Sequence, residues 1–127
     1  MIEAKRFTRI AADGLGGSIF QDDEFALDTP LAVVGTLPMR TGAIPAASAA
    51  VYVWADMSGG HPHPAPHLAP QKQWVVMLRG VIEVEVTDGS RRTFGAGDLI
   101  RVEDTEGTGH ITRYVGDPPF EALFLPG

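Results

Sequence analysis

The chain of 127 residues contains no cysteine. Disulfide bonds, thiolate metal ligands and cysteine nucleophiles are therefore excluded. Basic residues are also scarce, because 10 Lys and Arg stand against 16 Asp and Glu and the formal net charge is −6. This acidic balance opposes a large phosphate-binding surface, so we expect no nucleic-acid partner.

Long apolar runs are absent as well. No stretch approaches the roughly 18 apolar residues that a membrane-spanning helix requires. The N-terminal residues also lack the apolar run behind a basic region that marks a secretory signal. These absences predict a cytoplasmic protein without a membrane partner. The chain length fits one domain, and a hydrophobic content of 44% is enough for one continuous core.

Glycine and proline, in contrast, are plentiful. The 15 Gly and 10 Pro separate short β-branched and aromatic runs, which predicts many strands and few helices. Residues 1–30 are the least regular part of the chain. We expect strands over 31–37, 49–57, 74–78, 81–87, 91–94, 99–102, 110–115 and 120–125.

The clearest strand pair lies between residues 81 and 94. Residues 81–87 alternate strictly between apolar and polar, which is typical of a half-buried strand. Asp88-Gly89 then predicts a tight hairpin turn in which both residues have positive φ. About eight short strands in series predict a closed all-β barrel or jelly roll, which leaves no open sheet edges. We expect one domain over 1–127, with an irregular N-terminal arm to about residue 30 and the barrel from about residue 31.

Three polar side chains are the best candidates for a functional site. His67 and Gln73 precede the apolar run 74–78, and His110 begins a later strand. If His67, Gln73 and His110 meet at the mouths of neighbouring strands, they form a pocket for a metal ion or a polar ligand. In the alternative interpretation, His67 and Gln73 bind each other or a loop carbonyl and hold nothing.

Two further histidines precede this set, in the sequence Gly-Gly-His-Pro-His-Pro-Ala-Pro over residues 59–66. The prolines exclude a helix, so His63 and His67 are not spaced as one helical turn. In an extended chain they stand about 12 Å apart unless the chain turns. Either His61 or His63 folds back as a third His ligand, with His63 preferred, or both lie in an exposed loop.

From about residue 60 onward, the chain resembles the cupin superfamily. Gln73 lies seven residues before Gly80, where the superfamily usually has Glu, and His110 falls where its second motif has His. Residues 94–98, Phe-Gly-Ala-Gly-Asp, are similar to the opening of that second motif. Residues 67–73, 95–98 and 103–110 further resemble a group of bacterial cupins that is not tied to a known reaction.

The resemblance implies a cupin-type β-barrel that forms a homodimer and binds one divalent transition metal, such as Fe, Mn, Ni or Zn. Cupin metal sites typically resemble three His plus one Glu, so the candidate ligands here are His67, Gln73, His110 and His63. Two imidazoles and a neutral amide leave the charge of the ion uncompensated, so we expect weaker binding than at a site with Glu. A site without any cofactor stays open as an alternative.

Other side chains are candidates for lining a ligand pocket. Thr112 and Tyr114 share a strand face with His110, and Tyr52 and Trp54 share a face of an earlier strand. Gln71 lies two residues before Gln73, so the two side chains would point to the same face of a strand. Such a lining suits a small organic ligand. Alternatively, the aromatic residues only fill the barrel and Gln71 is exposed.

The acidic segment 103–106 precedes His110. Its carboxylates either interact with the His110 imidazole or control access to the pocket. The simpler interpretation is that the segment is an acidic loop exposed to solvent.

The same pocket is compatible with two functions. In the first, a metal-dependent enzyme acts on a small polar organic molecule. In the second, a barrel without metal binds or senses a small molecule and catalyses nothing. The N-terminal segment also has more apolar residues than a lone barrel needs, which supports the expected homodimer: Phe7, Ile10, Leu15, Ile19 and Phe20.

Overall fold

The computed structural model describes residues 4–45, 47–56, 60 and 63–127. All regular secondary structure in these residues is β, which confirms the all-β prediction. No helix in this part of the chain has the length and apolar character needed to cross a membrane. The strands are β1 (Ala4–Ala12), β2 (Ser18–Ala26), β3 (Thr29–Leu31), β4 (Met39–Thr41), β5 (Val51–Ala55), β6 (Gln73–Arg79), β7 (Val81–Glu85), β8 (Arg91–Phe94), β9 (Leu99–Val102), β10 (Ile111–Val115) and β11 (Phe120–Pro126).

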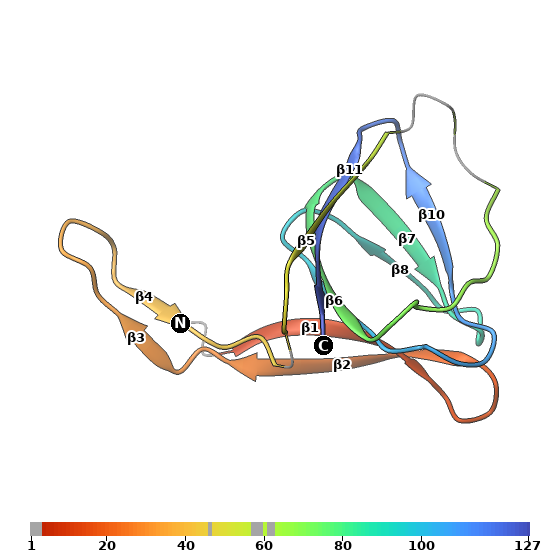
Figure 1. The fold of residues 1–127 in the computed structure, drawn as a ribbon, viewed down its shortest axis with the longest axis horizontal. Helices are drawn as coiled ribbons and strands as arrows, with labels where there is room; N and C mark the ends of the chain where they lie inside the picture. The colour runs from red at the N-terminus through yellow and green to blue at the C-terminus, as the bar shows by residue number, and fades with distance from the viewer. Residues whose placement is uncertain (1–3, 46, 57–59, 61–62) are drawn as a thin grey trace.

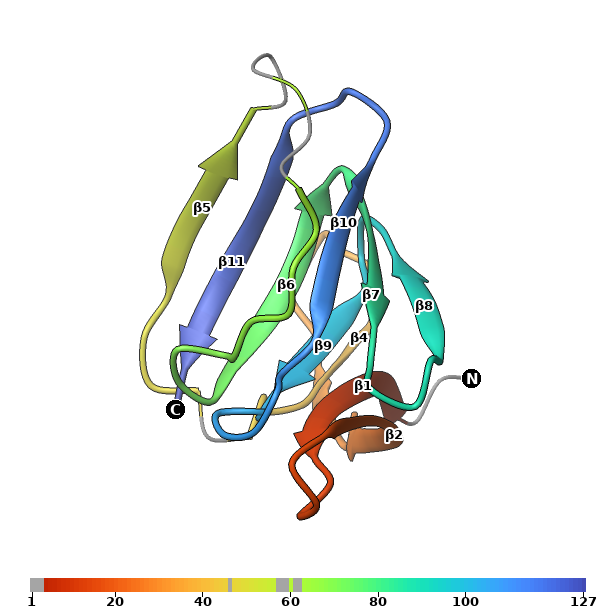
Figure 2. The ribbon, with the colours of Figure 1, turned by 90° about the vertical axis from the view of Figure 1, so that its right-hand side faces the viewer.

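Two sheets face each other and form the body of the molecule (Figures 1 and 2). The larger sheet has six strands in the order β2-β1-β9-β6-β11-β5, and the smaller sheet has the order β10-β7-β8. This arrangement is compatible with a β-barrel or jelly roll, but the described strands pair as open sheets with edges. Strands β2 and β5 are the edges of the larger sheet.

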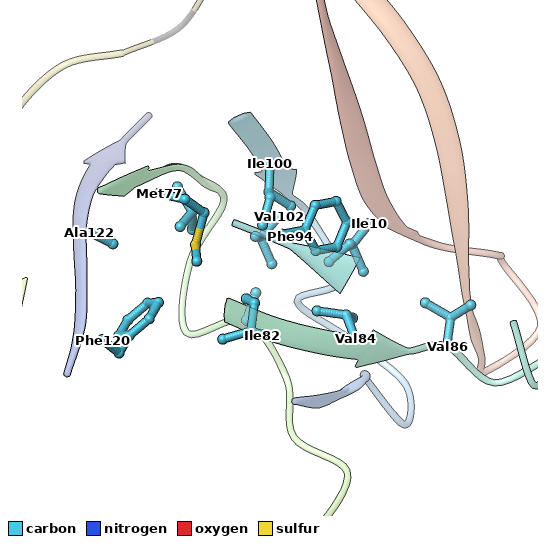
Figure 3. Packing of buried hydrophobic residues seen from close by; sticks show 12 residues of the cluster. Ile10, Met77, Ile82, Val84, Val86, Phe94, Ile100, Val102, Phe120 and Ala122 are labelled. Carbon is cyan, nitrogen blue, oxygen red and sulfur yellow. The ribbon is translucent and has the colours of Figure 1, made fainter. Parts of the chain in front are cut away.

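The main core lies between the two sheets. Alternating residues of facing strands point toward one another there, as Figure 3 shows. The alternation in β7 is the one that the sequence indicates, with Ile82 and Val84 buried and Glu83 and Glu85 partly exposed. The buried residues of this core are Ile10, Ala69, Val75, Met77, Ile82, Val84, Val86, Phe94, Ile100, Val102, Phe120 and Ala122.

The β7–β8 turn is longer than the two-residue turn that the sequence suggests. The Val86 carbonyl accepts a hydrogen bond from Gly89 N at 3.0 Å, and Val86 N donates to the Ser90 carbonyl at 3.0 Å. Gly89 has a φ of 88°. This pattern is a three-residue loop whose last residue is left-handed, the commonest hairpin connection after the two-residue turns.

The N-terminal segment is not the irregular arm that the sequence suggests. Strands β1 and β2 pair along their whole length, and β1 also pairs in parallel with β9, so this hairpin is part of the larger sheet. Ile10 belongs to the main core. This pairing forms although β2, an edge strand, is mostly exposed and acidic.

The expected strand over 31–37 is also wrong. The chain turns within it, where Thr36 N donates to the Val33 carbonyl at 3.0 Å and Gly35 has a φ of 85°. Short strands β3 and β4 flank this turn and pair antiparallel. We call residues 28–41 the hairpin arm, because they project from the body of the molecule (Figure 1).

Candidate functional site

A cavity of about 180 Å³ lies between the two sheets. Its walls are mainly apolar and come from β1, β6, β7, β9 and β11, whereas its polar lining comes from the residues around His67, β6 and β10. The lining residues His67, Leu68 and Pro70 are exposed, so the cavity opens beside them. Its polar and aromatic lining includes His67, Gln73, His110, Thr112, Tyr114, Phe120 and Phe124.

The structure brings His67 and His110 side by side. Their backbones form an antiparallel bridge, with His67 N donating to the His110 carbonyl at 2.9 Å and His110 N donating to the His67 carbonyl at 3.0 Å. The two imidazole centroids are 4.6 Å apart, and the ring planes are inclined by 59°. This bridge holds two residues that are distant in sequence at one end of the cavity.

Gly109 allows the bridge to form. Its φ is +82°, and a Cβ atom added there would collide with the His67 carbonyl. The buried Ser18 at the start of β2 holds the same loop, because its hydroxyl donates to the Gly109 carbonyl at 2.7 Å. On the other side, Ala69 N donates to the Asp104 carbonyl at 3.1 Å. Hydrogen bonds therefore hold the loop before β10 on both sides.

Asp104 orients the His110 ring. Its Oδ2 lies 2.5 Å from His110 Nδ1, and the Asp104 side chain is fully buried. A carboxylate accepts hydrogen bonds, so Nδ1 of the neutral ring carries the proton and Nε2 is left as an acceptor. His67 Nδ1 lies 3.3 Å from the Ala65 carbonyl oxygen, which favours the same tautomer for His67.

Gln73, Thr112 and Tyr114 complete the polar lining. Gln73 is buried at the start of β6, opposite Val102 of β9. Thr112 and Tyr114 lie opposite Val84 and Ile82 of β7. The Tyr114 ring meets the Phe120 ring edge-on, with centroids 5.7 Å apart.

The other candidate residues lie elsewhere. Gln71 and His63 are exposed and are not among the lining residues of the cavity. Tyr52 and Trp54 are exposed on the outer face of the larger sheet, because β5 turns Val53 rather than its neighbours toward the core. His61 lies outside the described residues.

The acidic loop before His110 is only partly solvated. Glu106 is exposed as the simpler interpretation expects, and Glu103 binds Arg9 and Arg101. Asp104, in contrast, is buried and contacts His110, so the interpretation as a solvated loop is wrong for this residue. A carboxylate six residues before a histidine, in a loop with two glycines, is the only sequence signal for this contact. Nothing in the sequence indicates that the Ser18 hydroxyl binds the Gly109 carbonyl.

The donor set decides how well a metal ion fits. Each Nδ1 lies near an oxygen acceptor, as is usual for ligating histidines, and both residues line the cavity. Gln73 adds a neutral amide, so no carboxylate compensates the charge of an ion. Within the described residues, no group of three or more His, Cys, Asp or Glu could hold a metal. The set does not fit a tightly held ion.

A larger groove of about 810 Å³ lies away from the histidines, between the β1–β2 hairpin and β8. Two of its charged groups bind each other, because Arg92 contacts Asp22 at 2.6 Å, and Arg92 also donates to the Thr8 hydroxyl at 3.1 Å. The smaller cavity brings two histidines and a buried amide together between the sheets, so it is the better candidate site.

The chain matches no protein-family model and no curated protein. The functional argument therefore depends on the geometry of the cavity.

Proposed function

We propose that the protein is a cupin-type barrel that binds a small organic molecule in the cavity between its sheets. The observation that supports this proposal most is the convergence of His67, Gln73 and His110 on one largely apolar cavity. A pocket with apolar walls and a few convergent polar groups is the usual form of a small-molecule site. The sequence motifs around residues 67–73 and 95–110 support the cupin assignment.

The cavity limits the chemistry of the ligand. A cavity of roughly 150 Å³ accommodates a molecule the size of benzene, so a volume of about 180 Å³ suits a ligand only slightly larger. His67 and His110 both present Nε2 as an acceptor, so the polar end of the ligand carries O–H or N–H donors. Small phenols and short-chain hydroxy compounds satisfy both conditions.

A thermal-shift screen of small phenols and hydroxy compounds tests the proposal. A ligand at about one hundred times its Kd stabilises the folded state by about 2.7 kcal/mol, which raises Tm by several degrees. His110→Ala should remove this shift, because it deletes one acceptor. His63→Ala is the matched control and should keep the shift, since His63 is exposed and outside the cavity lining. An equal shift in both variants would place the ligand elsewhere.

A metal-dependent enzyme is the second candidate function. It is favoured by one observation, the two adjacent imidazoles that line the same cavity, each with its Nδ1 near an oxygen acceptor. A divalent ion held by His67, His110 and Gln73 would supply Lewis-acid chemistry. Metal analysis during titration with Fe(II), Mn(II), Ni(II) and Zn(II) separates the two functions. One equivalent of metal bound by the native protein and lost in His67→Ala and His110→Ala would support the metal-dependent enzyme. No metal uptake by the native protein would rule that function out.

A further inference from the structure

The two imidazoles of the cavity have different partners. His67 Nδ1 lies 3.3 Å from a backbone carbonyl, that of Ala65, whereas His110 Nδ1 lies 2.5 Å from the carboxylate of Asp104. A carbonyl is sufficient to fix a tautomer, because it accepts the hydrogen bond of the ring N–H. A carboxylate adds a negative charge, which stabilises the ring when it takes up a second proton. His110 therefore has support that fixing its tautomer does not require.

The Asp104 carboxylate has little else to compensate its charge. Its side chain is fully buried, and within the described residues its ion-pair partner is His110 rather than a Lys or Arg. Among the same residues, no hydrogen-bond partner reaches its second oxygen, Oδ1. Burial of an ionised carboxylate is costly unless a charge or hydrogen bonds compensate it. A proton taken up by His110 places such a charge beside Asp104.

The cavity provides surroundings that suit a proton transfer. His110 is buried and lines the cavity, whose walls are mainly apolar. A histidine beside a pocket, with its Nδ1 held by a buried carboxylate, is the usual arrangement of a general base. Gln73, Thr112 and Tyr114 line the same cavity and carry N–H and O–H donors. Such donors can stabilise an oxygen on which negative charge develops.

The size of the cavity limits the reaction. Its volume of about 180 Å³ is filled by one molecule slightly larger than benzene. A second substrate has no room beside that molecule, so a reaction of a single molecule fits best. Proton transfer from one carbon of a ligand to the next is such a reaction. It needs no oxidant, reductant or other co-reactant.

We propose that the Asp104–His110 pair catalyses proton transfer within a small α-hydroxy ketone bound in the cavity. This inference rests on the proposed binding function and assigns a reaction to the same site. His110 Nε2 removes the proton from the carbon that carries the hydroxyl group. The electron pair of this C–H bond forms a C=C bond, and the carbonyl π electrons move onto the carbonyl oxygen. The step yields an enediolate and a His110 imidazolium beside the Asp104 carboxylate.

Return of the proton completes the reaction. The imidazolium gives a proton to the former carbonyl carbon, and the hydroxyl proton passes between the two oxygens, which yields the isomeric hydroxy ketone. Return to the original carbon regenerates the ligand instead. His67, whose ring centroid lies 4.6 Å from that of His110, lacks a carboxylate partner among its recorded contacts. Its role is to accept the hydrogen bond of the ligand hydroxyl group, so it positions the ligand.

Proton NMR in D₂O tests this reaction with 3-hydroxypentan-2-one as the probe and a chelator in the buffer. The native protein should convert the probe to 2-hydroxypentan-3-one. His110→Gln should lower kcat by about 100-fold or more, which is the usual contribution of a general base. His63→Ala is the matched control and should keep the native rate, because His63 is exposed and outside the cavity lining.

Asp104→Asn tests the positioning role of the carboxylate. Its amide N–H donates to Nδ1, so the ring proton moves to Nε2 and the base is lost. We expect kcat to fall by about 100-fold with little change in KM, and the thermal shift caused by the probe should persist and show that the variant is folded. His67→Ala should instead raise KM more than it lowers kcat.

The outcomes separate this reaction from the binding function. A thermal shift of the native protein by the probe without conversion would overturn the reaction and leave the binding function intact. Neither shift nor conversion would overturn the reaction for this ligand class, whereas a shift with phenols would still support binding. Conversion only after addition of a divalent metal would overturn it in favour of the metal-dependent enzyme. Full conversion by His110→Gln would overturn it by placing the base elsewhere.

Discussion

Gly109 illustrates how one residue without a side chain determines the site. Its left-handed backbone and its close approach to the His67 carbonyl let the loop before β10 pair with the segment before β6. Any Cβ at this position would meet the carbonyl that the bridge uses. The juxtaposition of the two imidazoles therefore depends on a residue that does not itself line the cavity.

Gly109→Ala should destabilise the fold and separate His67 from His110. The left-handed conformation alone costs about 1–3 kcal/mol for a residue with a side chain, and the collision with His67 adds to this. Gly97→Ala is the matched control, since Gly97 has a φ of +91° but open space around its Cβ position. Urea denaturation should show a larger loss for Gly109→Ala. Equal losses would mean that the close approach to His67 does not matter.

Asp104 sets the tautomer of His110. In the native protein the neutral ring should carry its proton on Nδ1, because Asp104 Oδ2 can only accept. Asp104→Asn keeps the shape of the side chain and lets an amide N–H donate to Nδ1, which moves the ring proton to Nε2. ¹⁵N chemical shifts of the imidazole distinguish the two tautomers. His63, which is exposed, should be unchanged in the same spectra. An Nε2–H tautomer in the native protein would contradict the assignment.

At the scale of elements, an ion pair connects the N-terminal hairpin to the smaller sheet. Arg92 of β8 contacts Asp22 of β2, and its guanidinium also lies 4.9 Å from the centroid of the Phe20 ring. The hydrogen bond from Arg92 and its positive charge hold the pKa of Asp22 below its usual range. Because the folded-state pKa is lowered, this stabilisation is present above the unfolded pKa and is lost as pH falls through the folded pKa.

Arg92→Ala should raise the pKa of Asp22 toward its ordinary value of 3.8. An NMR titration of the Asp22 carboxyl measures the change directly, and the effect on stability should be small because the pair is exposed. Arg91→Ala is the matched control. Arg91 binds Glu83 and Glu85, so its loss should leave Asp22 unchanged. If the two variants had the same effect on Asp22, the Arg92 contact would not be its cause.

The strands that the sequence predicts best are β8 and β9, which begin and end where the sequence indicates. The glycine turn at 95–98 separates them and marks one end of each. β1 and β2 were missed because their alternation is obscured by acidic residues whose arginine partners are distant in sequence, such as Asp23 with Arg9. The turn at 33–36 was missed because its flanking apolar residues imitate a buried strand while all of them are exposed.

The sequence predicts part of the candidate site, as it predicts part of the fold. His67, Gln73, His110, Thr112 and Tyr114 do line one cavity. Strand parity is a local property, and it placed Thr112 and Tyr114 on the face of His110. It could not reveal which face of β5 points inward, so it gave no reason to place Tyr52 and Trp54 outside. The burial of Asp104 depends on contacts across the fold and was equally inaccessible.

At the scale of the whole molecule, the surplus apolar surface lies in a different place from the one that the sequence suggests. Phe7 and Ile10 of the N-terminal segment are buried within their own chain, and Phe20 packs against the same core as Ile10. The apolar residues that stay exposed are concentrated in the hairpin arm and on the outer face of β5 and β6. Folding of one copy therefore leaves these apolar side chains exposed.

The homodimer that the cupin resemblance implies predicts a Tm that depends on protein concentration. When the folded state is dimeric and the unfolded state is not, mass action raises Tm as concentration increases. Val34→Asp should remove the dependence, because a carboxylate on the exposed apolar arm opposes association through that surface. Leu15→Asp should keep the dependence of the native protein. Differential scanning calorimetry over a hundredfold range of concentration measures all three, and a native Tm that stays constant would contradict coupled folding and association.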